Sequence, residues 1–218
     1  MRKSDTRDTT PAHRSGGLYR LLESARVYEL LQNLLGADAA QRRLVAEVVR
    51  PEAGARLLDI GCGAGDFFTY LPAGVSYAGY DLNPRYIETA RERFGNRAEF
   101  HCARAGAPPE ELLDGRFDKV LAKAVLHHLD DREAEALMRV AQCALRPGGI
   151  LVTLDPVFHP GQALVSRWLI ALDRGRQVRT PEGYVELLAG RFEPLESRVL
   201  TDLSRVPYSH FVLRARRV

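Results

Sequence analysis

Cysteine is scarce in this chain, and its positions follow no pattern. Cys62, Cys102 and Cys143 lie far apart among 218 residues. Disulfide scaffolds and zinc sites use regularly spaced cysteines, so neither is predicted, and no metal site is expected. The chain also lacks an apolar run of the roughly 18 to 20 residues that a membrane helix needs. After Met1, the next seven residues are charged or polar, and the segment lacks the apolar centre of a signal peptide. We therefore expect a cytoplasmic protein with no membrane span.

The chain has little excess of either sign of charge. The formal net charge is +3, which is too small to indicate nucleic-acid binding by itself, and none is expected. Arg214, Arg216 and Arg217 close the chain, and the general behaviour of charge runs predicts a solvated tail there. Apolar residues make up 45% of the sequence and charged residues 27%, as in ordinary globular proteins.

The beginning of the chain is predicted to differ from the rest. Residues 1–17 are polar and contain Pro11, Gly16 and Gly17, which predicts a flexible arm. Apolar residues then recur at helical spacing over 18–35, up to Gly36. We expect this helix to form a lid on a single domain that spans residues 18–218. A second helix is predicted over 38–49.

Strand and helix patterns alternate from residue 56 onward. Strands are predicted at 56–60, 75–80, 98–101, 117–122 and 150–154, with helices at 66–71, 84–94 and 131–145. This alternation predicts an α/β fold, a doubly wound Rossmann-like sheet that is mostly parallel and has helices on both faces. An insert follows over 157–190. Strands predicted at 192–200 and 206–213 are close in sequence, so the sheet should end with a C-terminal antiparallel strand.

A glycine-rich loop follows the first predicted strand. The sequence from Leu57 reads Leu-Leu-Asp-Ile-Gly-Cys-Gly-Ala-Gly-Asp-Phe, with glycines at 61, 63 and 65. Glycines at such a place let a ligand approach the backbone closely. A dinucleotide fingerprint would have a glycine at the sixth position, where this chain has Asp66. A carboxylate there suits a pyrophosphate poorly, which argues against NAD.

The second strand ends in Gly79-Tyr80-Asp81. Asp81 therefore lies beside the glycine loop, where a carboxylate can accept hydrogen bonds from the two hydroxyls of a ribose. Its alternative role is a turn or cap residue before Asn83-Pro84. The order of strand, glycine loop and acid favours a ligand that has a ribose and needs no pyrophosphate site.

At this point the chain resembles the class I S-adenosylmethionine-dependent methyltransferases of small-molecule type. Four segments carry the resemblance, which spans roughly residues 40–156: the loop at 57–65, Gly-Tyr-Asp-Leu-Asn at 79–83, Phe-Asp-Lys-Val-Leu-Ala-Lys-Ala-Val-Leu-His-His-Leu-Asp-Asp at 117–131, and Leu-Arg-Pro-Gly-Gly-Ile-Leu-Val-Thr-Leu-Asp at 145–155. The resemblance implies S-adenosyl-L-methionine as the cofactor.

The resemblance also implies a role for individual residues. The loop and strand ends should contact the methionine part, the ribose and the adenine of the cofactor. The residues are Asp59, Gly61, Cys62, Gly63, Gly65, Asp81, Leu82, Cys102, Ala103, Ala122, Lys123 and His127. The family often has an acid for the adenine amino group after the third strand, where this chain has Cys102-Ala103-Arg104.

A general base is needed only if the acceptor loses a proton as it attacks. The candidates are His127, His128, Asp155, His159 and Tyr208. His159 is preferred because it follows the fifth strand closely, at the sheet end where the acceptor should bind, and His127 is the second choice. The alternative role for the adjacent histidines is packing and capping.

The insert contains three arginines, Arg174, Arg176 and Arg179, that could bind an acidic group or simply end a helix. We therefore expect a methyltransferase for a small-molecule acceptor that could be acidic or lipid-like. The alternatives are an RNA or protein methyltransferase, and a catalytically silent protein of the same fold that binds the cofactor or a partner. The sequence leaves the acceptor, the methylated atom and the oligomeric state open.

Overall fold

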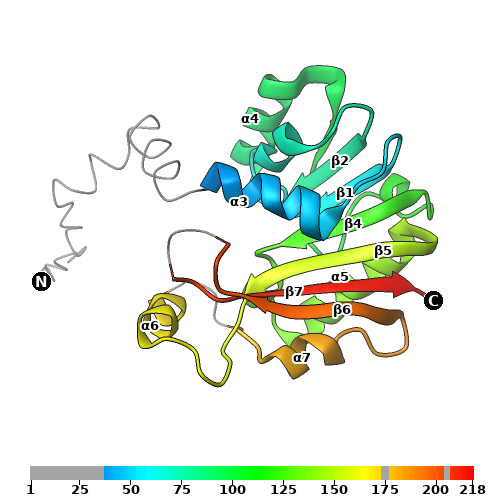
Figure 1. Cartoon of the computed structure of the whole chain (residues 1–218). Helices are drawn as coiled ribbons and strands as arrows, with labels where there is room; N and C mark the ends of the chain where they lie inside the picture. Colours follow the sequence, from blue (N-terminus) through cyan, green and yellow to red (C-terminus); the bar gives the residue numbers. More distant parts are fainter. Residues whose placement is uncertain (1–36, 173–176, 204–206) are drawn as a thin grey trace, which may run out of the picture.

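A seven-stranded sheet forms the centre of the protein (Figure 1). The computed structural model describes residues 37–172, 177–203 and 207–218. The predicted arm at 1–17 and the predicted lid helix at 18–35 lie outside these residues. The strands are β1 (Arg56–Ile60), β2 (Ser76–Asp81), β3 (Glu99–Cys102), β4 (Phe117–Lys123), β5 (Leu145–Pro156), β6 (Phe192–Leu200) and β7 (His210–Arg217).

The strand order is β3-β2-β1-β4-β5-β7-β6. Strands β1 to β5 pair in parallel, and β7 pairs antiparallel with both β5 and β6. This arrangement confirms the predicted fold class. The order reverses between β1 and β4, which places the carboxyl end of β1 at the point where ligands bind in such sheets.

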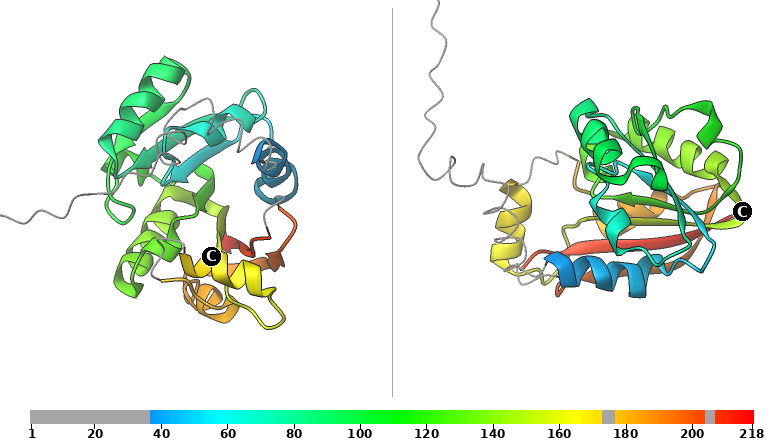
Figure 2. Two further views of the ribbon diagram at one scale, coloured as in Figure 1. Left: turned by 90° about the vertical axis from the view of Figure 1, so that its left-hand side faces the viewer. Right: turned by 90° about the horizontal axis from the view of Figure 1, so that it is seen from above.

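Helices cover both faces of the sheet (Figure 2). The longer ones are α3 (Ala37–Arg43), which continues as a π-helix over Leu44–Val49, α4 (Pro84–Phe94), α5 (Asp131–Ala144), α6 (Leu164–Leu172) and α7 (Pro181–Glu186). Short 3₁₀ turns lie at Asp66–Tyr70, Gly95–Arg97, Glu110–Leu112 and Leu126–His128. Each predicted helix among the described residues is therefore present, with the one at 66–71 wound as 3₁₀ helix.

Successive residues of β1 point to opposite faces and enter different hydrophobic clusters. Leu57 packs in the cluster that includes residues of α3 and α4. Leu58 packs in the cluster that includes residues of α5 and α7. Both side chains are fully buried. A strand covered on both faces requires apolar residues on both faces, which explains the adjacent leucines; the buried Asp59 interrupts this apolar run.

Two helices begin where side-chain caps allow. Asn83 accepts a hydrogen bond from the backbone N–H of Arg85 at the start of α4, with Pro84 in the first turn. Asp130 and Glu133 form a reciprocal capping box at the start of α5. Each cap satisfies backbone donors that the first helical turn leaves unpaired. The helix starts that follow β2 and β4 are thus fixed locally.

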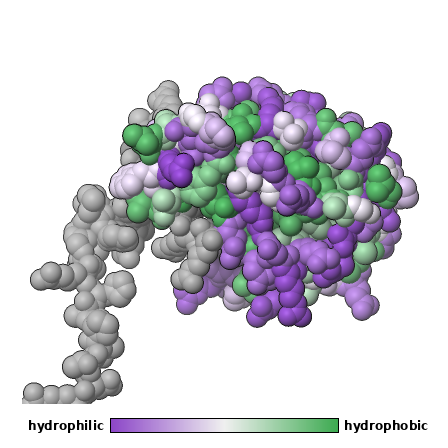
Figure 3. All heavy atoms as spheres, turned by 90° about the horizontal axis from the view of Figure 1, so that it is seen from below, coloured by the Kyte–Doolittle hydropathy of each residue, from purple (hydrophilic) through white to green (hydrophobic). Residues whose placement is uncertain are grey.

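The prediction of a solvated C-terminal tail is wrong. Strand β7 extends to Arg217, and Arg214 and Arg216 lie opposite Glu196 and Glu193 of β6 in the strand register. Their side chains pair with these glutamates at 3.1 and 2.6 Å. The arginines stabilise a cross-strand pair because the opposite strand supplies the carboxylates. Seen from below, hydrophilic residues cover much of the surface (Figure 3).

Candidate functional site

The glycine loop is tied to the neighbouring strand by its first two N–H groups. Gly61 and Cys62 donate to the carbonyl oxygen of Tyr80 at 2.8 and 3.1 Å. The Cys62 side chain turns inward, and a Cβ added at Gly79 would lie 2.9 Å from its sulfur. Burial raises the pKa of the Cys62 thiol, so the group stays neutral. At Cys62 only the backbone is placed to meet a ligand.

The three loop glycines share a positive φ but have different surroundings. A Cβ at Gly65 would meet Phe94 and Phe100 at 2.9 to 3.0 Å, and one at Gly61 would meet Val125 at 2.5 Å. A Cβ at Gly63 would meet nothing within 4 Å. Gly65 is therefore required for packing against aromatic side chains. Gly63 is the glycine that presents its backbone to open space.

Asp81 is held by two backbone donors. Its Oδ2 accepts from the N–H of Gly63 at 3.0 Å, and its Oδ1 accepts from the N–H of Asn83 at 2.8 Å. A carboxylate oxygen has two lone pairs, so each oxygen can still accept a second hydrogen bond. The carboxylate is therefore fixed in orientation and able to bind a pair of hydroxyls.

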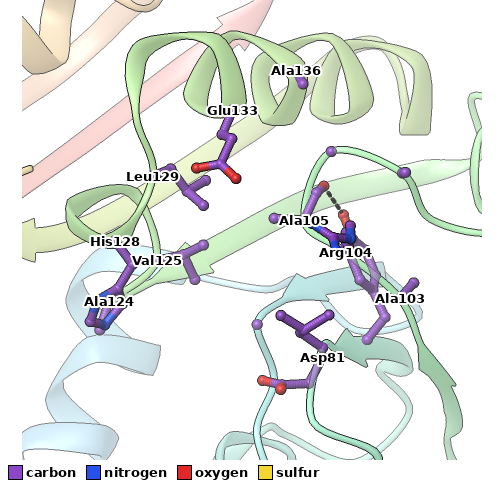
Figure 4. Close-up of a pocket in the computed structure, with 15 residues that line it drawn as sticks. Asp81, Ala103, Arg104, Ala105, Ala124, Val125, His128, Leu129, Glu133 and Ala136 are labelled. Carbon is purple, nitrogen blue, oxygen red and sulfur yellow. Dashed lines mark hydrogen bonds between the residues drawn. The ribbon is translucent and has the colours of Figure 1, made fainter. Parts of the chain in front are cut away.

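A first cavity of about 540 Å³ lies between the ends of β2, β3 and β4 (Figure 4). Asp81 and Glu133 enter it from opposite sides. The wall residues come from the glycine loop, the three strand ends and α5. They include Gly61, Tyr80, Asp81, Leu82, Ala103, Arg104, Ala124, Val125, His128, Leu129, Glu133 and Ala136. Of the predicted cofactor residues, Gly61, Asp81, Leu82 and Ala103 thus share one cavity.

A second cavity of about 530 Å³ lies on the other side of the chain that leaves β4. Its wall comes from α3, the ends of β4 and β5, and the start of β7. The residues are Ala37, Ala40, Gln41, Leu44, Lys123, Ala124, His127, His128, Leu154, Pro156, Leu203, Tyr208 and His210. Predicted residues Lys123 and His127 are among them. Ala124 and His128 line both cavities.

Ala124 separates the two cavities in an unusual backbone conformation. Its φ is 57°, a left-handed value that costs a residue with a Cβ on the order of 1 kcal/mol. Its N–H donates to the carbonyl oxygen of Leu154 at 2.7 Å, which fixes the end of β4 against β5. The conformation turns the chain sharply and brings His127 and His128 to the sheet end.

His127 forms a buried pair with Asp155. Its Nδ1 lies 2.8 Å from Asp155 Oδ1, and its backbone N–H donates to the same oxygen at 3.2 Å. His127 is 2% exposed and Asp155 is 1% exposed. A carboxylate at Nδ1 keeps the proton on that nitrogen and leaves Nε2 as an acceptor. The pair therefore has the arrangement of a positioned general base.

Asp59 and Lys123 are two further buried ionisable groups near the loop. Asp59 Oδ2 accepts from the Tyr77 hydroxyl at 2.7 Å, while Oδ1 is buried without a hydrogen-bond partner among the described residues. Burial raises the pKa of Asp59 to about 6. Burial likewise lowers the pKa of Lys123, whose Nζ lies 3.2 Å from Gln41 Oε1. Asp59 Oδ1 and the ammonium of Lys123 can therefore still form hydrogen bonds with a ligand.

His159 does not lie on the wall of either large cavity. Its ring nitrogens lie 2.9 Å from the Pro160 carbonyl oxygen and 3.2 Å from the Ser209 hydroxyl. It lines a separate cavity of about 230 Å³ with residues of the insert. The sequence preference for His159 over His127 therefore gains no support from its placement, because the chain after β5 turns away from the sheet end.

Other predicted site residues are also placed away from the cavity walls. The Ala122 side chain is fully buried in the core beside α5. Cys102 is exposed, and its sulfur faces the Leu82 carbonyl oxygen at 3.6 Å. Neither lines the two cavities, although their chain neighbours Ala103 and Lys123 do.

Arg179 holds the loop after β4 and is not placed to bind an acidic ligand. It donates to the carbonyl oxygens of Leu126 and Leu129 at 2.9 and 3.0 Å and pairs with Asp131 at 2.8 Å.

 Through Leu126 and Leu129 it fastens both ends of the turn that carries His127. Arg174 and Arg176 lie outside the described residues. The alternative considered for Arg179 in the sequence was a charged helix end, but the residue precedes α7 and its contacts give it a different structural role, on the turn after β4.

Several residues that line the two cavities carry no motif in the sequence. His210 lines the second cavity, but it lies in the C-terminal hairpin, where no motif marks it. Glu133 and Ala136 line the first cavity from α5, and their helical spacing suggested only a packed helix. Tyr208, a candidate base in the sequence, also lines the second cavity.

Among the described residues, no helix has the length and apolar character that crossing a membrane requires. Within the same part of the chain, no group of three or more His, Cys, Asp or Glu residues is arranged to hold a metal ion.

Comparison with known proteins shows similarity to methyltransferases. Residues 57–149 match a family described as a methyltransferase domain. The O-methyltransferase cnsE of Penicillium expansum is 35% identical over 135 residues, which cover 57% of this chain and 48% of that protein. The ubiquinone/menaquinone biosynthesis C-methyltransferase UbiE of Citrifermentans bemidjiense is 33% identical over 116 residues, which cover 48% of each protein.

A solved structure of a geranyl diphosphate methyltransferase in complex with SAM shares the fold. Its TM-score is 0.69 at 16% sequence identity, and the match covers 94% of this chain and 92% of that chain. The chain spans about half the length of the curated relatives it matches.

Proposed function

We propose that this chain, which belongs to the class I S-adenosylmethionine-dependent methyltransferases, transfers a methyl group to a small-molecule acceptor. S-adenosylmethionine is the cofactor of that family. The observation that carries the proposal is the meeting of two cavities of similar size at Ala124 and His128. One cavity has the groups that an adenosine needs, and the other has a base and apolar walls.

The residues of the first cavity fit the adenosine part of the cofactor. Asp81 has a fixed carboxylate with free lone pairs for two ribose hydroxyls. Leu82 is 63% exposed on the cavity wall, where it can cover an adenine ring, and Ala103 leaves room beside it. Gly63 does not line this cavity, but its N–H holds Asp81 and a Cβ there would point into open space, so we also assign its backbone to the ligand.

The methionine end would lie toward Asp59 and Lys123. An amino acid carries an ammonium and a carboxylate, and these two buried groups have the opposite charges. Asp59 Oδ1 has no partner among the described residues, so an ammonium would satisfy it. We assign Asp59 and Lys123 to that end of the cofactor.

The cofactor supplies a methyl group already activated on a sulfonium, so the protein mainly aligns the acceptor and excludes water. We assign the acceptor to the second cavity. His127 lines this cavity, and its Nε2 can take a proton that the acceptor loses. Asp155 holds the ring and stabilises the positive charge that then forms. His159 is not part of this assignment.

The segment at 18–35 and the insert at 157–190 remain proposed elements of acceptor selection. Segment 18–35 leads into α3, whose residues Ala37, Ala40 and Gln41 line the second cavity. The apolar residues of the second cavity, among them Leu44 and Leu154, suit an apolar acceptor.

A calorimetric titration tests the cofactor site. Wild-type protein should bind S-adenosylmethionine and S-adenosylhomocysteine but not NAD. Asp81→Asn should weaken S-adenosylhomocysteine binding by about tenfold or more, because an amide has one acceptor oxygen in place of two. Asp66→Asn is the matched control, since Asp66 pairs with Arg93 on the surface. Tight NAD binding, or equal affinities for wild type and Asp81→Asn, would overturn the assignment.

Turnover separates an enzyme from a silent binding protein. The protein is incubated with cofactor carrying a labelled methyl group and a mixture of small metabolites, or with RNA and protein in parallel. Label in a small molecule, lost in His127→Ala, supports the proposal. Label only in RNA or protein, or in no product, contradicts it.

A further inference from the structure

His210 is a polar residue of the second cavity that the assigned reaction has not yet used. It is the first residue of β7 and pairs with Pro156 of β5 and Leu200 of β6. Its Nδ1 is buried and has no hydrogen-bond partner among the described residues. The side chain also has a hydrogen bond with the backbone of Tyr208, and it lines the second cavity, where its ring can meet a ligand.

Several ionisable groups surround His210. Lys123 of β4, His127 and His128 of the following turn, and Tyr208 line the same cavity, and the Tyr208 ring lies 4.9 Å from the His210 ring. Asp155 of β5 lies behind His127. Burial, with the nearby His127 and Lys123, lowers the pKa of His210 to about 4. His210 is therefore neutral at physiological pH.

Building on the proposed function, we propose that the methyl acceptor is a neutral hydroxyl compound, and that His210 binds the hydroxyl-bearing end of it together with His127. The juxtaposition of the two imidazoles on one cavity wall carries this inference. His210 is assigned a binding role, and His127 remains the base.

Hydrogen-bonding capacity selects the hydroxyl. His127 donates from Nδ1 to Asp155, so its Nε2 can only accept and the bound group must donate to it. A hydroxyl donates and accepts, and so can satisfy both imidazoles. A carboxylate or phosphate dianion only accepts, and it would leave Nε2 of His127 facing negative oxygen.

Charge disfavours the other small donor. A protonated amine has no lone pair with which to attack the methyl carbon, and it could only donate to the two imidazoles. An anion would approach the carboxylate of Asp155 through the ring of His127, while Lys123 is assigned to the carboxylate of the cofactor. A neutral hydroxyl avoids both problems. The remaining wall residues are mostly apolar, including Leu44, Leu154 and Leu203, so the hydroxyl should sit on an apolar body such as an aromatic ring.

The transfer then balances in a single step. The acceptor oxygen forms a bond to the methyl carbon as the sulfur–carbon bond breaks, and the bonding electron pair stays on sulfur. The hydroxyl proton moves to Nε2 of His127, which later releases it to solvent. His210 takes no proton, because its low pKa keeps it a neutral hydrogen-bonding partner.

Matched naphthalene probes test the acceptor class. The full chain, saturated with S-adenosylhomocysteine, is titrated with 2-naphthol, 2-naphthoate, 2-naphthyl phosphate and 2-(aminomethyl)naphthalene, whose amine is protonated at neutral pH. 2-Naphthol should bind about tenfold more tightly than either anion or the ammonium. It should also be methylated on oxygen when the labelled cofactor is supplied. Tighter binding of an anion, or no binding of 2-naphthol, overturns the inference.

Variants test the residue. His210→Leu should raise KM for 2-naphthol about tenfold while kcat changes little, and His210→Gln should restore most of the loss because an amide both donates and accepts. His101→Gln, on β3 and away from both cavities, is the control. An unchanged KM in His210→Leu contradicts the inference, as does failure of His210→Gln to restore it.

The two levels of proposal can fail separately. Loss of S-adenosylhomocysteine binding in the wild type would defeat the proposed function itself. Normal S-adenosylhomocysteine binding without preference for 2-naphthol would defeat only the acceptor class. If the melting curve shows that His210→Leu does not fold, His210→Gln decides. A loss of affinity in His210→Gln that is the same for 2-naphthol and for the two anions contradicts a specific hydroxyl contact.

Discussion

The ring of His127 and the carboxylate of Asp155 lie 2.8 Å apart, although 28 residues separate them in the sequence. His127 belongs to the turn after β4, and Asp155 lies near the carboxyl end of β5. Because β4 and β5 are parallel neighbours, their carboxyl ends meet at one edge of the sheet. The pair is thus a product of the strand order, and it places His127, the proposed base, beside the second cavity.

Asp155→Asn should lower kcat by roughly 10²-fold or more with little change in cofactor affinity. An amide at this position can donate to Nδ1 of His127 and move the ring proton to Nε2, which then cannot accept a proton from the acceptor. Asp118→Asn, at the opposite end of β4 and paired with Arg146, is the control. Steady-state rates measure the effect, and an unchanged kcat would exclude His127 as the base.

Alanine at two glycines of the same loop should have different consequences. Gly65→Ala should lower the free energy of unfolding by about 2 kcal/mol or more, because its Cβ would overlap Phe94 and Phe100 in the core. Gly63→Ala should cost only about 1 kcal/mol, from its positive φ, yet weaken cofactor binding. Urea unfolding and calorimetry give the two quantities. Equal losses of stability in both variants would contradict the packing role of Gly65, and unchanged cofactor affinity in Gly63→Ala would contradict the assignment of Gly63 to the ligand.

Arg179→Lys should destabilise the protein by about 2 kcal/mol, because a lysine cannot bond the carbonyl oxygens of Leu126 and Leu129 and the Asp131 carboxylate together. Arg139→Lys is the control, since Arg139 is exposed and, among the described residues, pairs along its own helix with Glu135. Thermal unfolding measures the difference. If instead Arg179→Lys keeps its stability but loses binding of anionic acceptors, Arg179 contacts the acceptor and the structural role is wrong.

Asp59→Asn should stabilise the protein at alkaline pH. Since burial raises the pKa of Asp59 to about 6, the folded state binds more protons than the unfolded state between pH 4 and 6. The stability contributed by this group therefore falls as pH rises through that window. The variant should gain on the order of 2 kcal/mol over wild type between pH 4 and 8.

Urea unfolding at pH 4.5, 6 and 8 tests this dependence on pH. Asp114→Asn, at an exposed carboxylate beside Arg116, is the control and should show no such trend. A difference between Asp59→Asn and wild type that stays constant with pH would mean that Asp59 titrates at its ordinary value. The same variant should weaken cofactor binding, since it removes the charge assigned to the ammonium.

Local features of the fold were predictable from the sequence because short-range rules determine them. The caps at Asn83 and Asp130 depend on side chains next to the helix they start. The buried strand at Leu57–Ile60 is indicated by its apolar residues at 57, 58 and 60. The terminal arginines show the limit of such rules, because their pairing depends on Glu193 and Glu196 in another strand.

The sequence by itself determined the fold class, the glycine loop and the acid that follows β2, since each is written in adjacent residues. Only the tertiary structure decided which of these residues share a cavity. It placed His159 in a separate cavity, joined His127 to Asp155, and brought His210 from the last strand to the wall of the second cavity. The physical reason is that strand order and the left-handed turn at Ala124 are set by long-range packing, and no local pattern encodes them.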